Sequence, residues 1–443
     1  MPDLLVACFG LGFERTDIHL AGWRIFPGGI LPLPILFGLP ELVLVIVAGV
    51  DGQVVWVRHL QGEGGATTES AVDLEMAQDG RVILLVNALT DLTAQDYLTI
   101  ALDASDGDET WRVWYSGAGG ARDDSPSDLA VDMAGDIVVT GRSENAAGDR
   151  DFATVSYAVE DGAQRWVARY DAAGEHEDAI AVVAGFPGSV VVSGIGRSVA
   201  ADEGFLTISY SISDGQEQWL RRYDHAMGPL RDRVLSMGVD SVGDPRVVGV
   251  SWDGADTSLD VIRYRAADGD LLWASDEGIP DDEPESLGCM DMQANLLQMD
   301  LTGGFFVVSC AEISGAPFSV VTKRDSDGNA IWRYQADPAE WAMHRISGVS
   351  DDSAGDLLVT GDSRLIDGAS GIFAIKFDRQ RGEEIWRRFF PIESGNSESS
   401  VAVLVAENGD VVIASDLDRH GGDDDTRVRK LAPGDGSTIW TID

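Results

Sequence analysis

The chain has 443 residues, of which 44% are hydrophobic and 51 are Gly, a composition typical of a folded, turn-rich β protein. Its 32 Lys and Arg residues oppose 75 Asp and Glu residues, which gives a formal net charge of −43. Such a charge repels DNA, RNA and anionic membrane surfaces, so nucleic acid is excluded as a partner. An acidic, lysine-poor surface is typical of proteins that stay soluble in high salt, and a GC-rich genome produces the same bias.

Cysteine and histidine spacing predicts no metal site and no cofactor. The three cysteines, Cys8, Cys289 and Cys310, form neither an adjacent pair nor a CxxC motif, and the six histidines are scattered. Two acidic segments, 325–329 and 423–425, lack the full ligand spacing of a calcium loop and are interpreted as solvated loops.

Residues 1–41 allow two interpretations. In the first, residues 18–37 form an inner hairpin that turns at Pro27-Gly28-Gly29, and an apolar strand follows at 42–49. In the second, residues 30–50 are an export segment. Three prolines and Glu41 within 30–50 argue against a membrane-spanning helix, so no stable membrane span is predicted.

From residue 42 onward, one pattern recurs about every 54 residues. An alternating strand such as 97–104 leads into an Asp-Gly turn, or Arg-Gly in one copy, and then into a strand that holds a Trp. Asp-Gly supplies the positive φ angles of a tight hairpin turn. A Trp in the same register of every copy is predicted to lie in the core. These residues are Trp56, Trp111, Trp166, Trp219, Trp273, Trp332, Trp386 and Trp440.

Between these outer hairpins lie inner hairpins of small and branched apolar residues, such as 127–141 and 401–415. Four short strands per repeat predict an all-β fold, a β-propeller of four-stranded antiparallel blades over residues 42–443. Eight blades are favoured if residues 1–41 form a degenerate first half-blade. Seven blades are the alternative if those residues are an export segment.

The links between hairpins and between repeats are longer and more acidic than the turns. Both kinds of link lie at the same end of a blade, so this long-loop face is the predicted binding surface. Trp252 and Trp341 fall on these links, outside the repeat register, and are predicted to bind a ligand by stacking on a sugar or anchoring a protein. The alternative is that they cover the ends of the blades.

One interval between the repeated tryptophans, from Trp273 to Trp332, is longer than its neighbours. Cys289 lies just before the first strand of the inner hairpin at 295–310, and Cys310 ends its second strand. Those two ends are neighbours in an antiparallel hairpin. The sequence therefore predicts a Cys289–Cys310 disulfide, which favours an oxidising compartment outside the cytoplasm. Two free thiols are the alternative.

The hairpin ALDASDGDETW at 101–111 resembles the tryptophan-docking repeat of the PQQ-like (quinoprotein) propeller superfamily, as do residues 209–219 and 376–386. The inner hairpins are similar to the repeats of bacterial cell-surface propeller proteins. The superfamily includes dehydrogenases, assembly scaffolds and secreted proteins, so the resemblance implies the fold and leaves the activity open. Its quinone-dependent alcohol dehydrogenases have two adjacent cysteines against the cofactor, a pair that this sequence lacks.

The leading hypothesis is a non-catalytic binding or scaffold propeller, a monomer exported to the periplasm or surface of a bacterium. Its partner is expected to be a protein or a glycan. One alternative is an enzyme, either of the quinone redox type or a glycan hydrolase, because propeller active sites are assembled from residues scattered over several blades. Another alternative is a calcium-dependent adhesion module.

Overall fold

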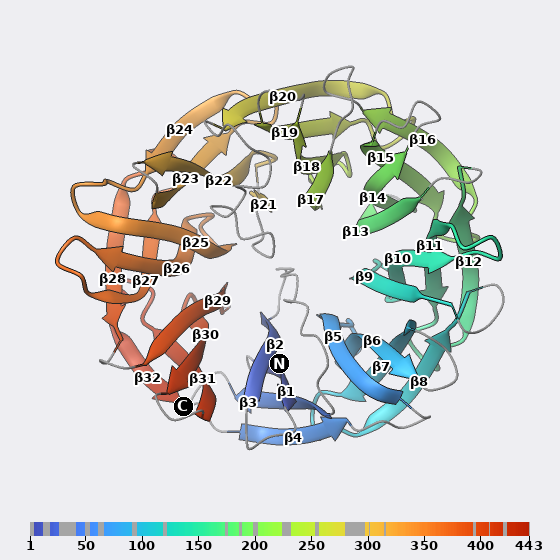
Figure 1. Cartoon of the computed structure of the whole chain (residues 1–443), viewed down its shortest axis with the longest axis horizontal. Coiled ribbons are helices and arrows are strands. Elements are labelled where there is room, and N and C mark those ends of the chain that lie inside the picture. Colours follow the sequence, from blue (N-terminus) through green and yellow to red (C-terminus); the bar gives the residue numbers. More distant parts are fainter. Residues whose placement is uncertain are drawn as a thin grey trace. The chain divides into compact units, whose positions relative to one another are not determined.

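The structure is a computed structural model, and in the part of the chain that it describes the regular elements are all β-strands (Figure 1). No helix among these residues has the length and apolarity needed to cross a bilayer. The described residues are 4–11, 18–25, 41–48, 54–60, 66–90, 95–117, 122–172, 176–185, 188–197, 203–223, 232–252, 257–279, 297–300, 302–313, 316–392, 396–406, 408–419 and 423–442.

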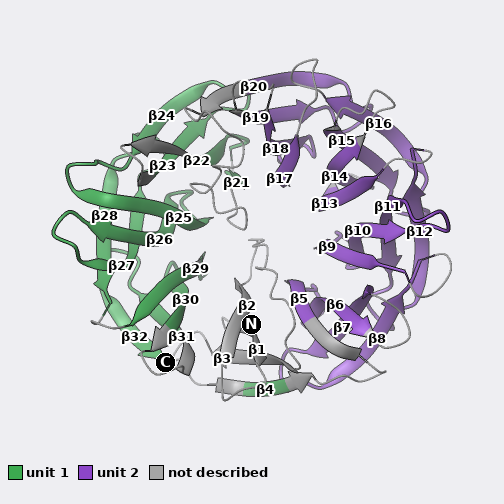
Figure 2. Ribbon diagram, viewed as in Figure 1, with its two compact units in different colours: residues 1–61, 285–443 green, residues 62–284 purple. Residues whose placement is uncertain are grey.

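The chain divides into two compact units (Figure 2). Residues 62–284 form one unit, and residues 1–61 together with 285–443 form the other. The strands of the unit at 62–284 are β5 (Ala66–Met76), β6 (Arg81–Thr90), β7 (Gln95–Asp103), β8 (Glu109–Tyr115), β9 (Asp124–Val131), β10 (Ile137–Glu144), β11 (Arg150–Tyr157), β12 (Gln164–Tyr170), β13 (Glu177–Gly185), β14 (Ser189–Arg197), β15 (Glu203–Ser211), β16 (Glu217–Tyr223), β17 (Arg233–Val239), β18 (Pro245–Trp252), β19 (Thr257–Tyr264) and β20 (Leu271–Ile279).

The second unit contains the two ends of the chain. Its strands are β1 (Leu4–Leu11), β2 (Ile18–Ile25), β3 (Glu41–Ala48), β4 (Val54–Leu60), β21 (Leu297–Met299), β22 (Phe305–Ile313), β23 (Ala316–Arg324), β24 (Ala330–Gln335), β25 (Trp341–Asp351), β26 (Leu357–Leu365), β27 (Ser370–Phe377), β28 (Glu384–Pro391), β29 (Ser397–Val405), β30 (Val411–Arg419), β31 (Asp423–Leu431) and β32 (Thr438–Ile442).

Within the unit at 62–284, each sheet has four strands that pair in chain order. The sheets are β5-β6-β7-β8, β9-β10-β11-β12, β13-β14-β15-β16 and β17-β18-β19-β20, and their pairings are antiparallel. Each sheet thus consists of an inner hairpin followed by an outer hairpin, which confirms the predicted four-stranded antiparallel repeat.

The second unit repeats this arrangement with two variations. Strands β21–β24 and β25–β28 form two four-strand groups that a single parallel pair, Phe318 and His344, joins into one eight-stranded sheet. The sheet at the N-terminus has the order β2-β1-β3-β4.

The N-terminal sheet uses different segments from those expected. Its third strand, β3, matches the apolar strand expected at 42–49, but its first hairpin joins β1 to β2 rather than spanning residues 18–37. Residues 26–40, with the expected Pro-Gly-Gly turn, lie outside the described residues. The domain boundary at residue 41 and the number of blades stay predictions.

The core of the unit at 62–284 lies between successive sheets. Leu85 and Tyr97 of one sheet, for example, pack in one buried cluster with Val139 and Val155 of the next. The inner strands are apolar on both sides because both faces of each sheet are buried.

Five of the eight repeated tryptophans are buried, as predicted: Trp56, Trp111, Trp166, Trp219 and Trp386 are 5–9% exposed. The other three, Trp273, Trp332 and Trp440, are only partly buried. The indole N–H of Trp166 donates a hydrogen bond of 2.8 Å to the carbonyl of Ile212, in the following repeat. Equivalent bonds join Trp111 to Val159, Trp219 to Ala266, Trp332 to Arg379 and Trp386 to Pro433.

Each of these indoles also packs on the Gly of the next outer turn. A Cβ atom added at Gly215, whose φ is +71°, would lie 2.7 Å from Cε3 of Trp166. Glycine is therefore required there both by its left-handed backbone and by the approach of the ring. In these turns the Gly N–H closes a loop onto the carbonyl four residues earlier, as from Gly215 to Ser211 at 2.8 Å.

Candidate functional site

The pairing of β9–β12 brings the long links together at one edge of the sheet. Glu144 pairs with Arg150, Phe152 with Tyr170, and Ser143 with Asp124. The link between the two hairpins, the end of the outermost strand and the start of the innermost strand therefore share this edge. The tight turns lie at the opposite edge, so the strands define the long-loop face that the sequence analysis proposed.

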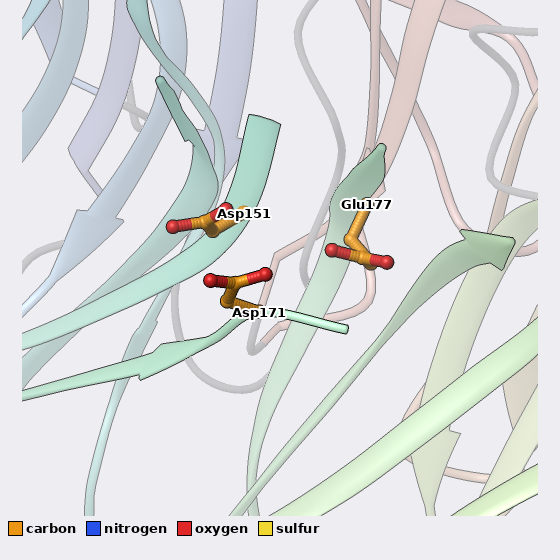
Figure 3. A group of neighbouring side chains, drawn as sticks. All are labelled: Asp151, Asp171 and Glu177. Carbon is orange, nitrogen blue, oxygen red and sulfur yellow. The ribbon is translucent and has the colours of Figure 1, made fainter. Parts of the chain in front are cut away.

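Three carboxylates meet on this face where β12 passes to β13. Asp151 is the second residue of β11, Asp171 directly follows β12, and Glu177 is the first residue of β13. One oxygen from each lies within 4.8 Å of the others. Figure 3 shows the carboxylate of Asp171 between those of Asp151 and Glu177. We call these three residues the carboxylate triad.

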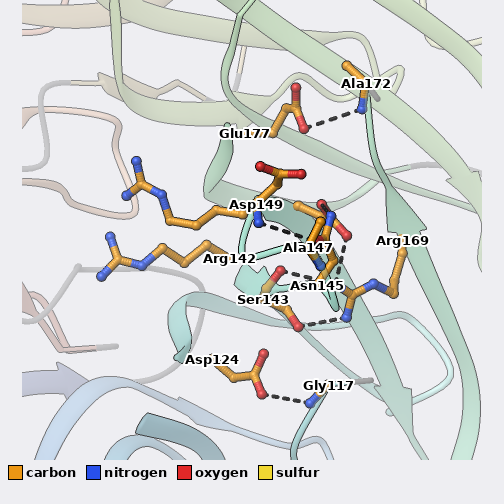
Figure 4. A network of polar contacts seen from close by, with 12 residues as sticks. Gly117, Asp124, Arg142, Ser143, Asn145, Ala147, Asp149, Arg169, Ala172 and Glu177 are labelled. Carbon is orange, nitrogen blue, oxygen red and sulfur yellow. Dashed lines mark hydrogen bonds and ion pairs between the residues drawn. The ribbon is translucent and has the colours of Figure 1, made fainter. Parts of the chain in front are cut away.

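Asp151 is held in place by two donors. Nη2 of Arg169 donates to its Oδ2 at 2.8 Å, and Nδ2 of Asn145 donates to Oδ1 at 2.9 Å. Arg169 is fixed in turn (Figure 4), since its Nη1 donates to Oγ of Ser143 at 2.6 Å and its Nη2 to the Ser143 carbonyl at 3.0 Å. Burial nevertheless raises the pKa of Asp151, because Arg169 offsets only part of the desolvation.

Glu177 is the least satisfied member of the triad. Its side chain is fully buried, and its Oε1 has no hydrogen-bond partner among the described residues. Its Oε2 accepts one long bond of 3.4 Å from the Ala172 backbone N–H. Burial raises the pKa of Glu177 to about 7, although the positive charge of Arg222 opposes this shift.

Two further contacts fix the strands that hold the triad. Nη1 of Arg150 lies 3.3 Å from Oδ2 of Asp178, and the Val182 N–H donates to Oδ2 of Asp128 at 2.7 Å. Both contacts join the sheet β9–β12 to the sheet β13–β16. The relative positions of β11 and β13, and hence of Asp151 and Glu177, are therefore set by side-chain contacts and by the packed core between the sheets.

The triad offers only hard oxygen donors, the type that Ca²⁺ and Mg²⁺ prefer. Sequence spacing gave no sign of it, because the three residues come from three strands that meet only through the repeat. A repeated pattern does mark Glu177, one member of the triad. An acid occurs at or next to the start of several inner strands, and it is buried in each case: Asp124, Glu177, Asp232 and Glu398.

Trp341 is not the exposed loop residue that the sequence analysis expected. It begins β25, and its side chain is 2% exposed. It packs edge-on against His344 with 5.0 Å between ring centroids, and it also contacts Phe373 and Phe389. Hydrophobic burial within the sheet explains the difference, and the indole offers no open face for stacking. Ligand binding by Trp341 stays an untested prediction. The exposure on which that prediction was based is absent, because the side chain is 2% exposed.

The other predicted site residues are not tested. Trp252 is the last residue of β18, and Cys310 lies in β22, but their side chains are outside the described part of the structure. Cys289 falls in the segment 280–296, which is also outside it. The Cys289–Cys310 disulfide therefore stays a prediction.

Comparison with known proteins identifies the family. A model of the outer membrane protein assembly factor BamB matches residues 41–275, more than half of the chain. This chain belongs to the BamB family. The match confirms the resemblance to PQQ-like propeller repeats. Among curated proteins, none matches the chain.

Solved structures similar to this BamB-family chain share its fold. The quinohemoprotein alcohol dehydrogenase ADHIIG from Pseudomonas putida HK5 is 14% identical with a TM-score of 0.52, over 94% of this chain and 72% of that one. The corresponding enzyme from Comamonas testosteroni is 13% identical with the same TM-score, over 94% and 73%. A europium-containing methanol dehydrogenase is 12% identical, also with a TM-score of 0.52, over 88% and 83%. These similarities confirm the β-propeller fold.

Proposed function

We propose that this protein is a non-catalytic scaffold that binds a protein partner on its long-loop face, outside the cytoplasm. Membership of the BamB family supports the proposal, because that family is described as an outer membrane protein assembly factor. The fold agrees with such a role, since the tight turns leave the longer links at one edge of each sheet for binding.

The chemistry of the exposed links favours a basic partner segment. In the unit with both chain ends, residues 337–340 follow β24, are exposed and include Asp337 and Glu340. Oε2 of Glu340 lies 2.7 Å from Nη1 of Arg387, whereas Asp337 forms no ion pair with a described residue. With a net charge of −43, the protein attracts a positively charged surface and speeds its association.

Site-specific photocrosslinking in the native host tests this proposal. A photoreactive amino acid replaces Asp337 on the long-loop edge, or Asp327 in the outer turn between β23 and β24. Both positions are exposed and belong to the same four-strand group, so they form a matched pair. We expect a protein crosslink from position 337 and none from position 327. Equal crosslinking at both positions, or crosslinking only at 327, would contradict the proposed face.

A further inference from the structure

Glu177 provides an observation independent of the clustering of acids. A carboxylate oxygen removed from water requires a hydrogen bond, a proton or a cation, because desolvation strongly disfavours a bare charge. Oε1 of Glu177 has no hydrogen-bond partner among the described residues, and the side chain is fully buried. Glu177 contributes one of the clustered oxygens of the triad, beside those of Asp151 and Asp171.

Two guanidinium groups offset part of the negative charge of the triad. Arg169 forms an ion pair with Asp151, with Nη2 and Oδ2 2.8 Å apart. The guanidinium of Arg222 donates to the hydroxyl of Tyr170 at 3.2 Å, and its charge acts on Glu177. The third carboxylate, that of Asp171, is exposed. Because Asp171 is exposed, a hydrated ion can reach the buried Glu177 from the solvent by way of Asp171.

The geometry points to a divalent cation site, and we propose that Asp151, Asp171 and Glu177 bind a calcium-sized ion on the long-loop face. Ca²⁺ has oxygen ligands at about 2.3–2.6 Å in flexible geometry, so two of its ligands can be about 5 Å apart, whereas Mg²⁺ demands near-ideal octahedral geometry and gives up its water reluctantly. The triad oxygens lie within 4.8 Å of one another, inside the span of a calcium sphere. Ca²⁺ takes 6–8 oxygen ligands, so water completes the sphere.

A bound ion would make the link between two successive sheets more rigid. Asp151 belongs to the sheet β9–β12 and Glu177 to the sheet β13–β16, while Asp171 lies on the link between them. An ion shared by these three residues joins two repeats, and the proposal does not depend on the proposed protein partner.

Calorimetric titration of the full chain with CaCl₂, after removal of metal by a chelator, tests the site. The buffer contains about 0.15 M NaCl, which screens diffuse attraction of cations to the acidic surface. We expect one site per chain and a rise in the thermal unfolding midpoint with CaCl₂. MgCl₂ at the same concentration is expected to bind more weakly.

Two variants and a control make the test specific. Asp171→Asn and Glu177→Gln each keep the side-chain shape but remove one charged oxygen ligand. Loss of an outer-shell contact alone weakens metal binding by about tenfold or more, so each variant is expected to weaken calcium binding by at least about tenfold. Asp171 is exposed, so its replacement leaves the core intact. Glu160→Gln removes the same charge from a side chain that is 71% exposed and lies in the turn between β11 and β12, at the edge of the sheet opposite the triad. This variant is expected to bind calcium like the wild type.

Three results would overturn the proposal. The first is the absence of both binding heat and thermal stabilisation at millimolar CaCl₂. The second is calcium binding by Asp171→Asn as tight as that of the wild type. The third is equal binding of MgCl₂, which would refute selection of a calcium-sized ion.

Discussion

At the scale of single residues, Trp166 stabilises the fold in two ways. Its indole is 6% exposed between two sheets, and its N–H donates to the carbonyl of Ile212 at 2.8 Å. Replacement by Ala removes the packing and leaves the partly buried carbonyl of Ile212 without this donor.

We expect Trp166→Ala to lower the free energy of unfolding by about 3–5 kcal/mol, as other large core truncations do. Chemical denaturation measures this loss. Val167→Ala, at the exposed neighbouring position, is the control and is expected to change stability by less than about 0.5 kcal/mol. A loss below about 1 kcal/mol for Trp166→Ala would contradict the burial of the repeated tryptophans.

His344 makes the stability of the protein depend on pH. Its ring is stacked on Phe373 with 4.0 Å between centroids, and neither ring nitrogen has a hydrogen-bond partner among the described residues. Burial lowers the pKa of His344 to about 3, and the nearby positive charge of Arg387 adds to this shift. In the unfolded chain the pKa is near 6.5.

Between pH 6.5 and pH 3 the unfolded chain therefore binds a proton at this position that the folded chain does not. The contribution of His344 is lost progressively as the pH falls through this window. We expect His344→Phe to be at least as stable as the wild type at pH 7, and its advantage to grow at pH 5. Denaturation curves at the two pH values measure the difference, and an advantage that stays constant or shrinks would contradict the buried neutral ring.

At the scale of the elements, the outer turns depend on contact between Gly and Trp. A Cβ atom at Gly382 would lie 2.5 Å from Cδ2 of Trp332, and the φ angle there is +68°. Gly368, in the same four-strand group, has a φ of +92° but no atom within 4 Å of such a Cβ. A comparison of Ala substitutions at Gly368 and Gly382 therefore separates the energetic cost of a left-handed backbone from the cost of contact with the indole ring.

We expect Gly368→Ala to cost about 1 kcal/mol, the strain of a left-handed backbone. Gly382→Ala should cost at least about 1 kcal/mol more, because the ring must move as well. Thermal or chemical unfolding of the two variants measures both costs. If they are equal, the docking of the indole on the turn contributes nothing beyond the backbone conformation.

These elements also explain which features the sequence could predict. The outer hairpins were predictable because their turn glycine and Trp recur in fixed register and act within one repeat and its neighbour. The carboxylate triad was not, because Asp151, Asp171 and Glu177 meet only through strand pairing and inter-sheet contacts. Trp341 was expected on a loop because it follows a polar link. It is in fact the first residue of β25, and its packing against Phe373 and Phe389 buries it.

The N-terminal hairpin shows the same limit. Pro27-Gly28-Gly29 is a strong local turn signal, yet the hairpin of the N-terminal sheet pairs β1 with β2, on the N-terminal side of it. The strand that follows, β3, was predictable because its continuous apolar run matches the third strand of the other repeats.

At the scale of the whole molecule, the net charge of −43 destabilises the compact state through self-repulsion. Salt screens exposed charges more than the buried ion pairs between strands. We therefore expect the thermal unfolding midpoint to rise between about 0.05 M and 1 M NaCl. A midpoint that falls over this range would indicate that exposed ion pairs outweigh the repulsion.

We propose that this BamB-family propeller is a scaffold for a protein partner rather than a quinone enzyme. Native mass spectrometry of the protein purified from its own host, compared with its denatured mass, tests this most directly. We expect the native monomer to differ from the denatured chain by no more than bound metal ions, and a second species to contain a protein partner. A stoichiometric adduct with the mass of a quinone cofactor, without any partner-bound species, would contradict the claim.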